Sequence, residues 1–139
     1  MSTIINRTFP GFFPSNCPTD SKEVDVEPVY RLVESNTIKA KEFIPSGIRK
    51  RSYLEGDCEA LALSVLGSKD DIPMAYRFFS SMGLSKKDKV AVGIITKDSG
   101  RVSFDKSKNV GDSHINWWTY DGIQPHTFFN NVLQIGVDI

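Results

Sequence analysis

The chain has 139 residues, 40% of them apolar and 24% charged, which is typical of a single globular domain and excludes a disordered or fibrous chain. Seventeen basic residues balance seventeen acidic ones, so no overall charge attracts the protein to nucleic acid or to an anionic membrane. We therefore expect neither a nucleic-acid partner nor a membrane partner.

The first 28 residues form a lead-in that is interrupted by four prolines. Proline cannot continue a helix or a central strand, so residues 1–28 are predicted to be extended. Three phenylalanines in this lead-in indicate that it lies along the body of the protein or against a partner. The body, residues 29–139, is predicted to be one domain.

The first half of the body alternates strand and helix signals. Residues 29–33 are rich in strand formers, and residues 38–43 predict a short helix. Residues 58–66 fit either a helix or a buried strand, because periodicity cannot decide a short apolar run. Beyond them, Asp70 or Asp71 is predicted to cap a helix that Gly83 ends, with an apolar stripe of Ile72, Ala75, Phe78, Phe79 and Met82.

The second half is predicted to be mostly strand. Residues 89–96 and 101–105 form two strands, and the Asp98-Ser99-Gly100 turn between them predicts a β-hairpin. A strand over 114–120, a short helix after Pro125 and an edge strand within 133–139 follow. No βαβ repeat is visible, so we predict a compact α+β domain with a mostly antiparallel sheet and two or three helices.

The two cysteines, Cys17 and Cys58, are far apart and have no metal-ligand spacing, so we expect no metal and no cofactor. The amino terminus has no signal-peptide pattern, and no apolar run is long enough to span a membrane. These features predict a cytoplasmic protein with reduced thiols. Two basic clusters, 49–51 and 86–89, lack neighbouring aromatic residues for base stacking and are interpreted as solvated turns.

The segment 112–122 concentrates both tryptophans, a histidine, a tyrosine and two carboxylates. Alternation along a strand would turn Ile115 and Trp117 toward the core and place His114, Asn116, Trp118 and Tyr120 on the other face. Aromatic side chains with polar tips are typical of contact surfaces, so this aromatic-histidine face is a candidate ligand or protein site. The alternative is an aromatic patch beneath the lead-in, with His114 as a structural residue.

Cys58 offers a catalytic alternative. The stretch from Gly56 to Ala62 resembles the Gly-x-Cys-x-x-x-Ala turn of transglutaminase-like and papain-like cysteine enzymes. That resemblance implies Cys58 as nucleophile and His114 as base. The carboxylates of Asp57 and Glu59 oppose thiolate formation, and a small buried cysteine is the competing interpretation.

A third interpretation is a nucleotide or NAD pocket similar to that of ADP-ribosyltransferase-like proteins. Arg31 on the early strand would hold phosphate, and His114 or Tyr120 would complete the pocket. The chain lacks the catalytic glutamate on a late strand that such enzymes carry. Arg31 and His114 facing one pocket would favour this interpretation.

The body also resembles a class of small, uncharacterised bacterial proteins. The matching features are Tyr30-Arg31, Phe43, Cys58 with Ser64, and Ser113-His114 with Trp117-Trp118. The resemblance implies a bacterial or phage origin and no particular activity. Because no nucleophile, base and orienting group are specified together, we expect a binding or regulatory module for a protein or small-molecule ligand rather than an enzyme.

Overall fold

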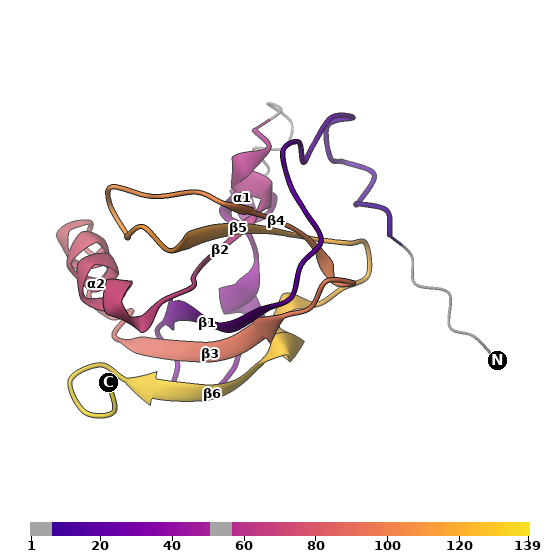
Figure 1. The fold of residues 1–139 in the computed structure, drawn as a ribbon. Coiled ribbons are helices and arrows are strands. Elements are labelled where there is room, and N and C mark those ends of the chain that lie inside the picture. Colours follow the sequence, from indigo (N-terminus) through magenta and orange to yellow (C-terminus); the bar gives the residue numbers. More distant parts are fainter. Residues whose placement is uncertain (1–6, 51–56) are drawn as a thin grey trace.

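The computed structural model describes residues 7–50 and 57–139, which form one α+β domain around a six-stranded antiparallel sheet (Figure 1). The predicted fold class is confirmed. Arg51 and Gly56, which belong to two of the motifs above, lie outside the described residues. The strands are β1 (Val26–Val33), β2 (Leu63–Leu66), β3 (Lys89–Ile95), β4 (Gly100–Phe104), β5 (His114–Thr119) and β6 (Phe129–Gln134).

The helices are α1 (Ser46–Lys50) and α2 (Ile72–Ser81), and short 3-10 turns occupy Ala40–Phe43, Glu59–Leu61, Lys69–Asp71 and Pro125–Phe128. The ambiguous stretch 58–66 therefore divides into a turn and strand β2. The predicted stop of α2 is confirmed, since Gly83 takes a left-handed φ of 81°. Met82 lies beyond the helix and is 58% exposed, so it does not belong to the apolar stripe.

The strands lie in the order β4-β5-β2-β1-β3-β6, and the sheet opens in its middle. Strands β1 and β2 pair only at Tyr30 and Leu66, whereas β1 and β3 pair over most of their length. Figure 1 shows the result as two layers, with β2, β4 and β5 in one layer and β1, β3 and β6 in the other. The main core fills the space between these layers and draws buried residues from both, including Trp117, Val65, Val29 and Ala91.

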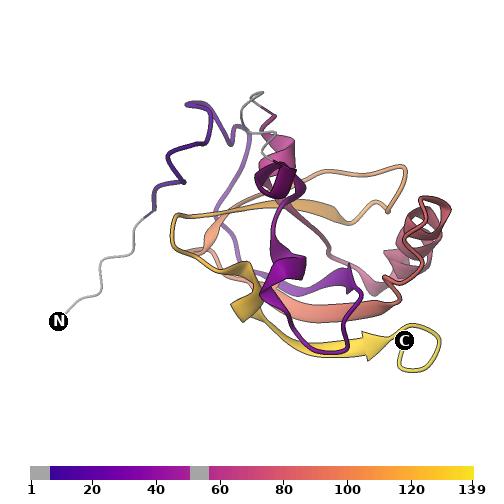
Figure 2. The ribbon, with the colours of Figure 1, turned by 180° about the vertical axis from the view of Figure 1, so that it is seen from behind.

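The open side of the two layers is crossed by the segment between β1 and α1, which Figure 2 shows from behind in purple. Phe43 on this segment is buried, and its ring lies 4.7 Å from that of Phe129. Phe128 contacts Trp117 edge-on from the same side, with ring centroids 5.5 Å apart. Aromatic side chains from local turns thus close a core that the strands leave open.

The predicted hairpin between β3 and β4 is wrong. Strand β3 pairs with β1 and β6, while β4 pairs with β5, so the two strands belong to opposite layers. The lead-in occupies the other edge of β4, where Lys22 and Val102 exchange both backbone hydrogen bonds at 2.9 Å. Because that edge is already paired, the 96–99 turn carries the chain across the molecule instead of folding β4 back onto β3.

Two smaller apolar clusters lie outside the main core. One packs α2 on the sheet through Leu32, Leu66, Ile72, Ala75 and Val90. The other packs the lead-in on β5 and gathers Cys17, Leu61, Ala62 and Trp118, with Phe9 and Phe13 against them. Each cluster covers an outer face of the sheet, so β5 is buried on both of its sides.

Candidate functional site

Three of the four residues on the aromatic-histidine face of β5 are buried, whereas His114 is partly exposed and lines a cavity. Trp117 is fully buried as predicted, but Trp118 and Tyr120 are only 3% exposed and Asn116 is 5% exposed. The prediction of an accessible face is therefore wrong for Asn116, Trp118 and Tyr120. Trp118 and Tyr120 form an aromatic patch that the lead-in covers, whereas His114 lines a separate cavity. Local alternation does not predict this burial, because the side chains of the lead-in that cover Trp118 come from residues about a hundred positions earlier in the chain.

Three of the predicted binding residues have structural partners. The Trp118 indole donates a hydrogen bond to the Cys58 carbonyl at 2.9 Å, and the Tyr120 hydroxyl donates to the Glu23 carboxylate. The ring of Phe9 packs on Tyr120 at 4.9 Å. The Asn116 amide donates to Ser103 Oγ and Asp105 Oδ2. These side chains hold the lead-in and the β4–β5 connection in place.

Cys58 forms a disulfide with Cys17, and this pairing corrects the expectation of reduced thiols. A disulfide sulfur carries no thiolate, so the oxidised protein has no nucleophile at this position. The ring nitrogens of His114 bond to Asp105 and Ser64 instead of to Cys58. The structure therefore does not assemble the Cys58–His114 pair that the cysteine-enzyme resemblance implies.

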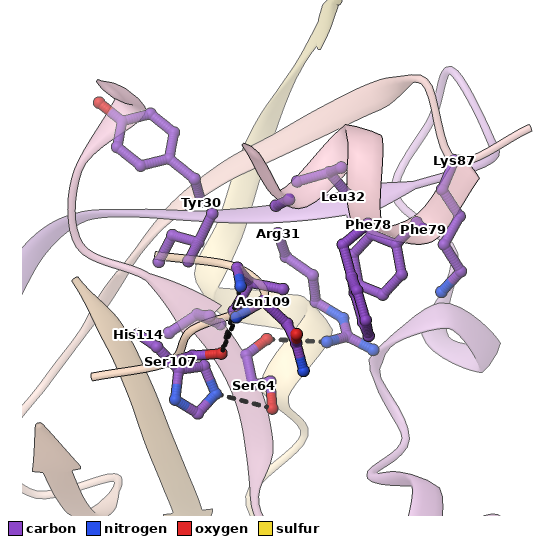
Figure 3. A pocket seen from close by; sticks show the side chains of 14 residues that line it. Tyr30, Arg31, Leu32, Ser64, Phe78, Phe79, Lys87, Ser107, Asn109 and His114 are labelled. Atoms are coloured by element: carbon purple, nitrogen blue, oxygen red, sulfur yellow. Dashed lines mark hydrogen bonds between the residues drawn. The ribbon is translucent and has the colours of Figure 1, made fainter. Parts of the chain in front are cut away.

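Arg31 and His114 do meet, in a cavity of about 250 Å³ between α2 and the sheet (Figure 3). Its walls come from β1, β2, α2, the α2–β3 connection, the β4–β5 connection and the start of β5. The apolar wall consists of Leu32, Leu66, Ala75, Phe78, Phe79 and Val110. The polar lining residues include Arg31, Ser64, Lys87, Ser107, Asn109 and His114.

Arg31 occupies the gap where β1 and β2 separate. Extending their antiparallel register by two residues would place Leu32 opposite Ser64, but the backbones have already diverged there. The Arg31 guanidinium donates instead to the Ser64 carbonyl at 2.8 Å and to the Glu42 carbonyl at 2.9 Å. A side chain thus replaces the missing strand pairing and brings a cation to the floor of the cavity.

The cations at the cavity interact with the described carboxylates of Glu42 and Glu34 only beyond ion-pair distance. Burial lowers the pKa of Arg31 to about 10, which leaves it charged at neutral pH. Burial also lowers the pKa of Lys87, and the positive charges of Arg31 and Arg49 add to this effect. Among the described residues, neither Arg31 nor Lys87 has a carboxylate within ion-pair distance. Arg31 and Lys87 thus bring two positive charges to the cavity, and the Glu42 carboxylate acts on both of them from beyond ion-pair distance.

His114 is held by both ring nitrogens. Its Nδ1 lies 2.8 Å from the Asp105 carbonyl oxygen. Its Nε2 lies 3.2 Å from Ser64 Oγ (Figure 3). A carbonyl oxygen only accepts hydrogen bonds, so Nδ1 carries the hydrogen, and the neutral ring presents the Nε2 lone pair to the serine hydroxyl. His114 thus lines the cavity with Arg31, and its Nε2 contacts Ser64 where the cysteine-enzyme resemblance implies Cys58.

Sequence reasoning missed Lys87 and the pocket role of the α2 phenylalanines, and it named Ser64 only as part of a resemblance. Lys87 stands in a basic cluster that was interpreted as a solvated turn, although its ammonium lies 5.4 Å from the Phe79 ring centroid. The adjacent Phe78 and Phe79 near the end of α2 indicate a pocket, because two neighbouring residues of a helix cannot both lie at the centre of its buried stripe.

Within the described ranges, no group of three His, Cys, Asp or Glu residues is arranged to hold a metal ion. None of the helices in that part of the chain combines the length and the apolar character needed to cross a membrane. Comparison with protein-family models, curated proteins and solved structures finds no match to this chain.

Proposed function

We propose that the protein is a binding module for a compact organic anion, held in the cavity between α2 and the sheet. Arg31 and Lys87 would receive the anionic group, and the wall of Leu32, Phe78 and Phe79 would contact the apolar or aromatic part. The observation that supports this most directly is that Arg31 and Lys87, neither of which has a described carboxylate within ion-pair distance, line the same cavity as the apolar side chains of Leu32, Phe78 and Phe79.

Electrostatics supports an anion in preference to a neutral ligand. Burying cations near one another is unfavourable, and a bound anion relieves both their mutual repulsion and their lost hydration. Charge-assisted hydrogen bonds from guanidinium and ammonium groups are also stronger than neutral ones. The binding free energy would therefore depend strongly on the ligand charge and on the salt concentration.

The size of the cavity limits the ligand. Pockets for drug-sized molecules usually enclose roughly 300–1,000 Å³, and this cavity, at about 250 Å³, lies just below that range. A nucleoside monophosphate or a smaller aromatic acid suits this space better than NAD or ADP-ribose. The proposal thus keeps the nucleotide interpretation of Arg31 and His114 and narrows it to mononucleotide size.

The cytoplasmic location remains a prediction. The Cys17–Cys58 disulfide weighs against it, because disulfides persist mainly in oxidising compartments. A thiol-trapping measurement on protein taken directly from its native cells distinguishes the two locations.

Calorimetric titration with nucleoside monophosphates, the matching neutral nucleosides and inorganic phosphate tests the proposal. We expect the monophosphates to bind and the nucleosides to bind at least about tenfold more weakly, which corresponds to about 1.4 kcal/mol. Lys87→Gln should weaken monophosphate binding by about tenfold, because it removes one charge from the cavity. Lys86→Gln is the matched control, since Lys86 is the exposed neighbour.

Two results would contradict the proposal. One is the absence of a heat or thermal-shift response to every monophosphate and small aromatic acid at low salt. The other is an equal loss of affinity in Lys86→Gln and Lys87→Gln, which would indicate general surface attraction without a defined receptor.

A further inference from the structure

The hydroxyl of Ser64 has the surroundings of an activated nucleophile. Ser64 is exposed on strand β2, within the cavity, and its Oγ lies 3.2 Å from Nε2 of His114. The tautomer fixed by the Asp105 carbonyl makes that nitrogen the proton acceptor. The Ser64 hydroxyl, the His114 ring and the Asp105 carbonyl are therefore linked by successive hydrogen bonds. General-base activation of a hydroxyl requires such a nucleophile, a base and a group that orients the base.

Positive charge lies next to this serine. The Arg31 guanidinium donates to the carbonyl of Ser64 itself at 2.8 Å, and Lys87 lines the same cavity. In Figure 3 the serine hydroxyl turns toward His114 while its carbonyl turns toward Arg31. Fixed cations near an acyl carbon would stabilise the negative charge that develops on its oxygen during attack.

We propose that Ser64 is the nucleophile, and His114 the general base, of an esterase activity toward small esters that carry a second, anionic group. The choice of an anionic substrate rests on the proposed function, because Arg31 and Lys87 would hold that group. The nucleophile itself depends only on the contacts of Ser64 and His114.

The reaction has two balanced steps with water as the co-reactant. Ser64 Oγ forms a bond to the acyl carbon while its proton moves to Nε2 of His114. The bond between the acyl carbon and the alcohol oxygen then breaks, and His114 gives the proton to the leaving alcohol. A water molecule, deprotonated by His114, next attacks the acyl-serine, so the acid is released and the Ser64 hydroxyl is restored.

Labelling with a fluorophosphonate, which modifies activated serine hydroxyls, tests the nucleophile. We expect peptide mass spectrometry to find the adduct on Ser64 in the native protein. His114→Gln should slow this labelling by about 100-fold or more, the scale of general-base catalysis. Ser85→Ala, which alters an exposed serine outside the cavity, should leave the rate unchanged.

Absence of the Ser64 adduct, or equal rates in the wild type and His114→Gln, overturns the proposal. If His114→Gln does not fold, the wild type alone decides the question: an activated serine reacts in the native protein and not in urea, whereas equal labelling in both states refutes activation.

The substrate class is tested with 4-nitrophenyl acetate and the 4-nitrophenyl monoester of succinate, which carries a free carboxylate. The carboxylate of the succinate ester also attacks its own ester, so the rate without protein is subtracted for each substrate. We expect a larger enzyme-catalysed rate for the succinate ester and at least a 100-fold loss of both catalysed rates in Ser64→Ala. Equal rates for the two esters would refute the anionic substrate and count against the proposed function, even with Ser64 labelled. Nucleotide binding without any Ser64 labelling would instead support the proposed function and reject the nucleophile.

Discussion

Removing the Cys17–Cys58 disulfide is the sharpest test of the tertiary arrangement, because this bond joins the lead-in to the body. The two residues are 41 positions apart in the chain. In the double variant Cys17→Ala/Cys58→Ala, the unfolded chain regains the freedom that the closed loop denied it. We expect the variant to fold, with a lower free energy of unfolding than the oxidised wild type.

The magnitude follows from the loop length. The chain-entropy relation for a closed loop of 41 residues gives about 4 kcal/mol at 25 °C. Domains of this size are stable by roughly 5–15 kcal/mol, so the loss is a large fraction of the total. Lost packing of the two sulfurs adds to the entropic effect, because Cys17 is only 7% exposed.

Urea denaturation of the oxidised wild type, the reduced wild type and the double variant measures this difference. Tryptophan fluorescence gives a second readout, since Trp118 donates to the Cys58 carbonyl and packs beneath the lead-in, whereas Trp117 lies in the main core. We expect reduction to shift the emission of Trp118 to longer wavelength. Two free thiols in protein purified without reductant, or a free energy of unfolding that reduction leaves unchanged, would refute the reasoning.

Two further predictions concern single ionisable groups. Burial opposes ionisation of Glu42, but hydrogen bonds from Ser35 and Glu34 outweigh it and lower its pKa below 4.5. Glu42→Gln should therefore lower the free energy of unfolding by about 1 kcal/mol near neutral pH. This difference from the wild type should vanish as pH falls through the lowered pKa of Glu42. Urea titrations of both proteins at several pH values measure it. Burial, reinforced by the Glu23 carboxylate, raises the pKa of Tyr120 above 10.0. The neutral hydroxyl therefore stabilises the fold below pH 10.0, and this stabilisation is lost as pH rises through the raised pKa that Tyr120 has in the folded protein. Tyr120→Phe should lower the free energy of unfolding by about 1 kcal/mol at neutral pH, and an unchanged urea midpoint would contradict the role given to the Glu23 contact.

Local patterns predicted those elements whose cause lies within a few residues. The apolar spacing in residues 72–79 and the glycine at 83 predicted α2 and its end, because helix period and a left-handed stop are local properties. Alternation along 114–119 correctly placed Trp117 in the core. The same alternation separated the side chains of β5 into two faces, as any strand must.

The sequence by itself determined the fold class, the position of α2 and the two faces of β5. Only the tertiary structure decided what covers each face, because burial depends on distant segments: the lead-in lies over Trp118 and pairs with β4, which also excludes the predicted hairpin. The pairing of Cys17 with Cys58 has the same origin. The candidate site also depends on the tertiary structure, because its residues come from separate elements: Arg31, Ser64, Lys87 and His114. They line a cavity near the point where β1 and β2 diverge, and no local sequence pattern predicts that divergence.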